Sequence, residues 1–244
     1  MHVLILGGTT EASELASLLA SRPDLRATLS LAGRTKNPVL PPISHRIGGF
    51  GGAEGLAVWV RENHVTAIID ATHPFASRMP FNAAAAAKAC GVPIISLTRL
   101  TWKAQTGDDW LEVETHQLAI DSLSATGKRI FLTVGRLEID NYIAAHQHFY
   151  LVRTIDDVSP KQLQNAKYIT ARAPFSVEEE QALMEEHHID TLITKNSGGH
   201  ATAAKLVAAR NLGIKVILIS RPPKPDIPFV MSAEAALAWI IHKT

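Results

Sequence analysis

The stretch Leu4-Ile5-Leu6-Gly7-Gly8-Thr9-Thr10-Glu11-Ala12 decides the fold class. It predicts a buried strand that runs into a tight glycine turn and then into a helix. In that geometry, free backbone N–H groups and the positive end of the helix dipole face whatever lies above the turn. The dinucleotide fingerprint G-x-G-x-x-G is matched in part, because Gly7 stands at its first position, Thr9 at its second and Ala12 at its third. We expect a phosphate ligand here, to which the Thr9 hydroxyl could donate; the alternative is a turn that binds nothing.

Outward from this turn, short β-branched runs alternate with helical patterns along the whole chain. Such alternation predicts parallel sheets covered by helices. Strands are expected at residues 2–6, 27–31, 44–47, 67–70, 93–97, 129–134, 149–152, 168–171, 191–194 and 215–220. Helices are expected at 11–21, 53–63, 78–89 and 201–211, from a capping box at Ser176 to about residue 187, and from about residue 232 onward.

A polar stretch at residues 100–109 interrupts the periodicity and marks a domain crossover. We therefore expect an α/β fold of two Rossmann-like open parallel-sheet domains, with the active site in the cleft between them. Residues 1–100 form the expected nucleotide-binding domain and residues 101–244 the second domain, with the boundary somewhere in 98–128.

Composition excludes several classes of protein. The 244 residues are 46% hydrophobic and 19% charged with a net charge of +1, which is typical of a globular protein with no affinity for nucleic acid. Apolar runs are only strand-length, so we expect no membrane contact. Because the chain lacks the pattern of a signal peptide and carries one cysteine, Cys90, a cytoplasmic location is expected. No metal site is expected either, since His146 and His148 lack partners at metal-site spacing.

The segment after the second expected strand bears on the choice of nucleotide. An acidic residue there commonly binds the ribose 2′-hydroxyl of NAD. This chain instead has Arg34 and Lys36 and no carboxylate. Because a guanidinium binds a phosphate in a bidentate manner, the sequence favours NADPH, with Arg34 on its 2′-phosphate. The alternative is a solvated basic loop.

The segment Asp70-Ala71-Thr72-His73-Pro74-Phe75-Ala76 follows an apolar strand, at the end where open α/β sheets bind ligands. Pro74 restricts His73 to an extended conformation and holds the loop in one shape. His73 is a candidate proton donor or cofactor contact. A purely structural histidine is the equally weighted alternative.

The segment Thr194-Lys195-Asn196-Ser197-Gly198-Gly199-His200 joins a strand to a helix and repeats the anion-binding arrangement in the second half. Cations also stand at the carboxyl ends of six expected strands, which predicts a basic cleft suited to a ligand with several carboxylates or phosphates. Some of them are expected to face solvent or a neighbouring acid. These cations are Arg99, Arg136, Arg153, Arg172, Lys195 and Arg221.

Together with Thr133-Val134-Gly135 and Arg221-Pro222, the glycine turn and these two segments resemble the precorrin-6A reductase family of cobalamin biosynthesis over essentially the whole chain. The resemblance implies a reductase that transfers hydride from a reduced nicotinamide to a macrocyclic tetrapyrrole-derived substrate rich in carboxylates, giving precorrin-6B. Transient contact with neighbouring pathway enzymes would be compatible with it. The alternatives are a cobalt-precorrin-6A reductase that uses NADH, another NADP-dependent reductase of a polyanion, and a non-catalytic nucleotide- or tetrapyrrole-binding protein.

The resemblance, together with the glycine turn and the cations at the strand ends, gives expected roles for individual residues. The expected cofactor contacts are Gly7, Gly8, Thr9, Thr10, Arg34, Thr72, His73, Pro74, Ser197 and Gly198. The expected substrate contacts are Arg99, Arg136, Arg172, Lys195, Asn196 and Arg221. Reduction also requires a proton, which His73 or Lys195 could supply, as could water or the acids of the substrate.

Overall fold

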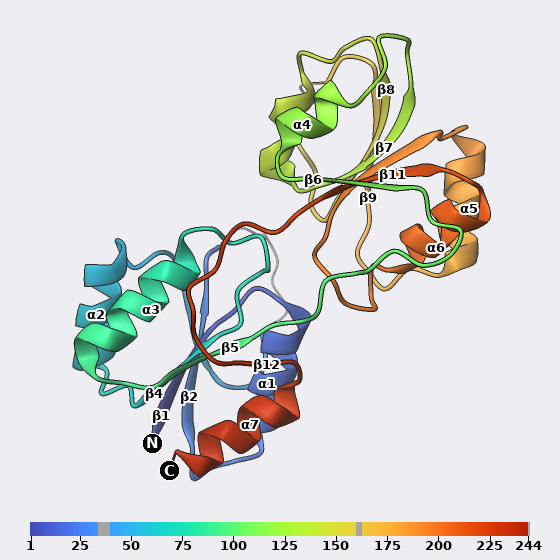
Figure 1. Cartoon of the computed structure of the whole chain (residues 1–244). Coiled ribbons are helices and arrows are strands. Elements are labelled where there is room, and N and C mark those ends of the chain that lie inside the picture. The colour runs from blue at the N-terminus through green and yellow to red at the C-terminus, as the bar shows by residue number, and fades with distance from the viewer. Residues whose placement is uncertain (34–39, 160–162, 244) are drawn as a thin grey trace. The chain divides into compact units, whose positions relative to one another are not determined.

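The computed structural model describes residues 1–33, 40–159 and 163–243. The chain divides into two compact units (Figure 1). The first consists of Met1–Leu100 together with Pro222–Thr244, and the second of Thr101–Arg221. Both are parallel sheets covered by helices, so the expected two-domain α/β fold class is confirmed.

The sheet of the first unit has the order β12-β5-β4-β1-β2-β3 among the described residues, and every neighbouring pair is parallel. Its first five strands in chain order follow the 3-2-1-4-5 pattern of doubly wound folds. The strands are β1 (His2–Leu6), β2 (Arg26–Leu31), β3 (Ser44–Ile47), β4 (Ala67–Asp70), β5 (Ile94–Leu97) and β12 (Phe229–Val230).

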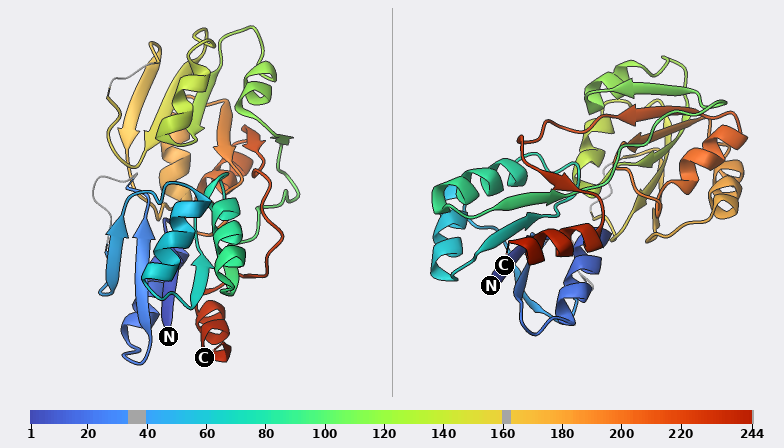
Figure 2. Two further views of the ribbon diagram at one scale, coloured as in Figure 1. Left: turned by 90° about the vertical axis from the view of Figure 1, so that its left-hand side faces the viewer. Right: turned by 60° about the horizontal axis from the view of Figure 1, so that its bottom comes forward.

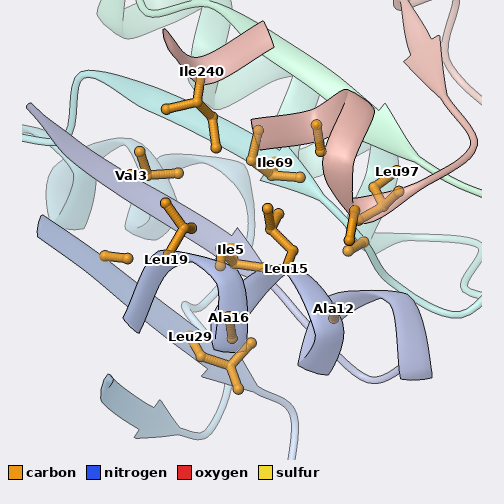
Figure 3. Packing of buried hydrophobic residues seen from close by; sticks show 14 of the residues in the cluster. Val3, Ile5, Ala12, Leu15, Ala16, Leu19, Leu29, Ile69, Leu97 and Ile240 are labelled. Atoms are coloured by element: carbon orange, nitrogen blue, oxygen red, sulfur yellow. The ribbon is translucent and has the colours of Figure 1, made fainter. Parts of the chain in front are cut away.

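Strand β1 is buried throughout because helices cover both faces of the sheet. Val3 and Ile5 pack with α1 and α7 (Figure 3). Leu4 and Leu6 pack with α2 and α3, which lie on the other face of the sheet (Figure 2). A strand buried on both faces is a continuous apolar run, and this explains why β1 is evident from the sequence. The helices are α1 (Thr10–Ala20), α2 (Ala53–Glu62), α3 (Met79–Cys90) and α7 (Ala233–His242).

The C-terminal segment belongs to the first unit and not to the second, where the sequence placed residues 222–244. Strand β12 pairs with β5, aligning Phe229 with Ser96. Helix α7 buries Ala236 and Ile240 against α1 and β1 (Figure 3). The C-terminal segment packs on the first unit because α7 covers apolar side chains of β1 and β4 that α1 alone would leave exposed.

The second unit repeats the strand order. Its sheet runs β6-β11-β10-β7-β8-β9 with parallel neighbours throughout the described residues. In both sheets the sixth strand comes from outside the series of the other five: β12 follows them along the chain, whereas β6 precedes them. The strands are β6 (Trp110–Val113), β7 (Arg129–Thr133), β8 (Phe149–Thr154), β9 (Ala166–Thr170), β10 (Thr191–Lys195) and β11 (Lys215–Ile219).

Helices of the second unit include three that the sequence predicted only in part or not at all. Helix α6 (Ala204–Asn211) begins three residues later than expected, and α4 (His116–Asp121) was not expected. The 3₁₀ helix η1 (Arg136–Tyr142) lies between two strands where the sequence predicted a helix without giving its bounds. Helix α5 (Val177–Glu186) begins with the predicted capping box, in which Ser176 and Glu179 exchange hydrogen bonds. No helix among the described residues is both long enough and apolar enough to span a bilayer.

Candidate functional site

The turn after β1 lies where the strand order reverses between β1 and β4, the usual ligand position in open α/β sheets. Gly7 packs closely on β2, since a Cβ there would lie 2.6 Å from a methyl carbon of Leu29. Gly8 has φ +131°, and a Cβ on it would meet no heavy atom within 4 Å. The turn therefore needs glycine for its backbone conformation at Gly8 and leaves space above it for a ligand.

Thr9 caps helix α1 and joins the turn to the loop after β4. Its hydroxyl accepts a hydrogen bond from the N–H of Ala12 (3.2 Å) and donates one to the carbonyl oxygen of Ala71 (3.0 Å). The hydroxyl hydrogen is thus engaged within the protein, which argues against its donation to a phosphate. The N–H groups of Thr10 and Glu11, in the first turn of α1, have no intrahelical acceptor and are the better phosphate donors.

The loop after β4 is organised by Asp70, which is buried at the end of that strand. One of its carboxylate oxygens accepts hydrogen bonds from the N–H (3.1 Å) and the hydroxyl (2.7 Å) of Thr72. Burial raises the pKa of Asp70, while these bonds and the charge of Lys224 oppose the rise. Lys224, from the C-terminal segment, donates to the carbonyl oxygen of Ala76 at 2.6 Å, so two chain segments hold this loop.

His73 is half-buried in the same loop, next to the buried Pro74. Its Nδ1 accepts a hydrogen bond from the N–H of Phe75 at 3.2 Å. This assigns the proton of the neutral ring to Nε2. His73 therefore offers a donor at Nε2 from a ring whose other nitrogen is engaged in the loop.

Arg99 forms an ion pair in the structure, and its expected contact with the substrate stays a prediction. Its guanidinium lies 3.0 and 3.2 Å from the two carboxylate oxygens of Glu11, and both side chains are about one-fifth exposed. The pair places a neutralised acid in the first turn of α1, where an unpaired carboxylate would repel a phosphate. Arg34 lies outside the described residues, and its contact with a 2′-phosphate stays a prediction.

At the carboxyl edge of the second sheet, the strand order reverses between β7 and β10. Lys195, at the end of β10, lies 3.1 Å from a carboxylate oxygen of Glu138 on η1, with side-chain exposures of 12% and 29%. His116 interacts electrostatically with both Glu138 and Lys195. Burial lowers its pKa most, while the charge of Glu138 raises it and that of Lys195 lowers it. The sequence did not single out Glu138 or His116, and no local pattern identifies either.

The loop after Lys195 is held by hydrogen bonds to two other segments of the second unit, which contribute Trp102 and Arg221. The Asn196 side chain accepts from the N–H of Trp102 (2.8 Å) and donates to its carbonyl oxygen (3.1 Å). Arg221 donates to the carbonyl oxygens of Asn196 and Ser197, both at 2.9 Å. These contacts favour a structural role for Asn196 and Arg221, whose binding of substrate stays a prediction. Gly198 has φ +67°, a conformation that favours glycine.

The remaining cations at strand ends differ in exposure. Arg153 is buried against Glu180 at 2.6 Å and lies over the ring of Phe175, so it belongs to the core. Arg172 pairs with Asp156 at 3.1 Å and is 45% exposed, and Arg136 is exposed. Most of the cations from which the sequence predicted a basic edge therefore form ion pairs with carboxylates. The expectation of an active site in a cleft between the domains stays a prediction.

Two doubly wound parallel sheets, with a glycine turn and a helix N-terminus where the first one reverses, define a two-domain α/β protein of the kind that binds ligands at the carboxyl ends of its strands. A family model described as "Precorrin-6x reductase CbiJ/CobK" matches residues 2–241. The chain belongs to this family and is an oxidoreductase.

Similarity to individual proteins extends over nearly the full length. The chain is 47% identical over 240 residues to the precorrin-6A reductase of Rhodococcus erythropolis, covering 98% of this chain and 97% of that one. It is 45% identical over 242 residues to that of Sinorhizobium sp, covering 99% and 93%. A solved structure titled "CobK precorrin-6A reductase" matches with a TM-score of 0.94 at 41% identity, covering 100% and 97%.

Proposed function

We propose that this protein catalyses the reduction of precorrin-6A to precorrin-6B, with NADPH as the hydride donor. Its similarity to relatives of that name carries the proposal. Four relatives named precorrin-6A reductase are 45%, 47%, 42% and 40% identical to the chain. Three named cobalt-precorrin-6A reductase are 28%, 26% and 27% identical. The difference favours the ring without cobalt as the substrate.

The residues of the first unit fit a reduced dinucleotide. The positive φ and open surroundings of Gly8 allow a phosphate to approach the backbone. The first turn of α1 offers N–H donors, and the pairing of Glu11 with Arg99 removes a repulsive charge. The residues of this unit that would hold the cofactor are Gly7, Gly8, Thr9, Thr10, Arg34, Thr72, His73 and Pro74. The cofactor contacts expected of Ser197 and Gly198, which belong to the second unit, stay predictions.

When bound, the dihydronicotinamide supplies the hydride. The protein then has to orient the macrocycle, exclude water and place a proton. His73 presents an N–H at Nε2, and Lys195 presents an ammonium group at Nζ, so either can donate the proton. Among the cations proposed for the carboxylates of the substrate, Arg136 and Arg172 are the most accessible. Arg99, Asn196 and Arg221 can bind substrate only in addition to the partners they already have.

Turnover with defined rings tests the proposal. Purified protein is mixed with NADPH and precorrin-6A, and the loss of reduced-nicotinamide absorbance is followed, with product identified by a mass gain of two hydrogens. The same assay with NADH and with cobalt-precorrin-6A provides the comparison. We expect fastest turnover with NADPH and the cobalt-free ring. Faster reduction of the cobalt-containing ring with NADH would favour the cobalt-precorrin-6A alternative, and binding of NADPH without turnover would favour a non-catalytic binding protein.

A further inference from the structure

The carboxyl edge of the second sheet brings together a cation and an acid that lie 57 positions apart in the sequence. Lys195 stands at the end of β10, and Glu138 is on η1, which follows β7. We infer that Glu138 is a positioning residue, which holds the Lys195 ammonium group in the orientation in which it meets the substrate. This inference rests on the proposed function, in which Lys195 contacts the macrocycle.

Gly135 supports the inference through its lack of a side chain. Its backbone, with φ −152° and ψ 160°, is one that any residue adopts. The need for glycine therefore comes from space, because a Cβ would lie 2.5 Å from a carboxylate oxygen of Glu138 and 3.4 Å from Lys195 Nζ. A methyl group at this position would push the Glu138 carboxylate away, since the end of that side chain moves more easily than the backbone.

Helix η1 fixes the position from which Glu138 reaches Lys195. The N–H of Glu138 donates to the carbonyl oxygen of Gly135 (3.0 Å), and its own carbonyl oxygen accepts from the Asn141 side chain (2.8 Å). Tyr142, at the end of η1, is fully buried, and its hydroxyl lies 3.0 Å from Nδ1 of His116 on α4. The carboxylate is thus held on an anchored turn and not on a free loop.

The arrangement orients a side chain that would otherwise sample many rotamers. A lysine ammonium group is a point charge on a flexible four-carbon stem, so its direction depends on a partner. The Lys195 side chain is 12% exposed, which limits water as an alternative partner. Removing the charge of Glu138 should therefore leave Lys195 present but poorly directed, and this affects the substrate and not the dinucleotide.

Kinetics of three variants test the functional part. Glu138→Gln removes the charge, Gly135→Ala displaces the carboxylate, and Asp140→Asn is the matched control because Asp140 is an exposed acid on the same helix. We expect the first two variants to lower kcat/KM for the macrocycle by about tenfold or more, as misplacement of a group at an active site does. Their KM for NADPH should stay unchanged, and Glu138→Asp should recover part of the activity. Asp140→Asn should behave as wild type.

Acetylation of Lys195, read by peptide mass spectrometry, tests the geometric part without turnover. Labelling should be faster in Glu138→Gln and Gly135→Ala than in wild type and Asp140→Asn. Unchanged labelling, or faster labelling with unaltered kcat/KM, would overturn the inference. If wild type reduces no precorrin-6A, the proposed function fails on its own, and labelling still decides whether Glu138 holds Lys195. Should Gly135→Ala fail to fold, Glu138→Gln carries both measurements.

Discussion

The Thr9 hydroxyl donates a hydrogen bond to the carbonyl oxygen of Ala71 at 3.0 Å, and thereby ties the glycine turn after β1 to the loop after β4. The hydroxyl oxygen of Thr9 also accepts a hydrogen bond from the N–H of Ala12 and thereby caps α1. One side chain thus stabilises a helix start and joins the two loops that would receive the dinucleotide. The stability of the protein and its affinity for the cofactor should therefore both depend on the Thr9 side chain.

Thr9→Ala should lower the free energy of unfolding by about 0.5–2 kcal/mol, the usual effect of losing an N-cap, and raise the KM for NADPH. Thr9→Ser keeps the hydroxyl and should retain both. Urea unfolding and steady-state kinetics give the two quantities. Ser232→Ala is the control, because Ser232 caps α7 in the same unit. It should lose similar stability without a change in KM, and a Thr9→Ala variant with the wild-type KM would contradict the coupling.

Arg34→Ala tests the choice of nucleotide. A guanidinium on the 2′-phosphate contributes to NADPH binding and not to NADH binding. We therefore expect the variant to raise the KM for NADPH much more than that for NADH. Kinetics with both nucleotides, supported by thermal-shift titrations, provide the measurement. Equal effects on the two constants would remove the assignment.

The buried pair of Arg153 and Glu180 makes a prediction about stability alone. Their side chains are 8% and 1% exposed and lie 2.6 Å apart. Glu180→Ala should lower the free energy of unfolding by about 3–5 kcal/mol, because it leaves Arg153 as a buried charge without its partner. The double variant Arg153→Met/Glu180→Leu should lose much less. Denaturant unfolding of the two variants tests this, and an equal loss in both would refute it.

His148 should make stability depend on pH. It is fully buried, its Nδ1 accepts from the N–H of Lys128 at 3.0 Å, and burial lowers its pKa. Below about pH 6.5 His148 becomes protonated in the unfolded chain, whereas it stays neutral in the folded protein. The free energy of unfolding therefore falls as the pH falls. Above that pH His148 is neutral in both states, and its contribution to the free energy of unfolding is fully present.

Urea unfolding at pH 8 and pH 5.5 measures this dependence. His148→Asn keeps an acceptor for Lys128 but cannot titrate, so it should lose less stability than wild type between the two pH values. The dependence should not vanish, because burial also lowers the pKa of His2, His116 and His187. An identical pH dependence in wild type and variant would exclude His148 as a source.

The sequence predicted the central strands of both sheets well, and the physical reason is their burial. Strands such as β1 and β11 are covered on both faces, and their sequences are apolar runs. The edge strands β6 and β12 were missed because they are short and partly exposed. Moreover, β12 directly follows Pro228, and its partner β5 lies more than a hundred residues earlier, so no local pattern reveals the pairing.

For the candidate site, the sequence predicted the loops better than the state of their side chains. Loops that follow buried strands can be located from the strands themselves. The acids that face Arg99 and Lys195 are 88 and 57 positions away, and only the folded chain brings them together. For the same reason the sequence could not predict that the Thr9 hydroxyl donates its hydrogen bond within the protein, since the acceptor Ala71 is 62 positions away. The roles assigned to individual residues in binding and catalysis stay predictions.

The return of the chain to its first unit has a consequence during synthesis on the ribosome. Domains usually fold in order of emergence, at about 5–20 residues per second. Here the second unit is continuous, whereas the first lacks β12 and α7 until residues 222–244 emerge. The N-terminal unit therefore keeps the edge of β5 and the apolar surface around Ile5 uncovered until the segment that contains β12 and α7 has emerged. A nascent chain stalled before Pro222 is the species on which chaperones should act.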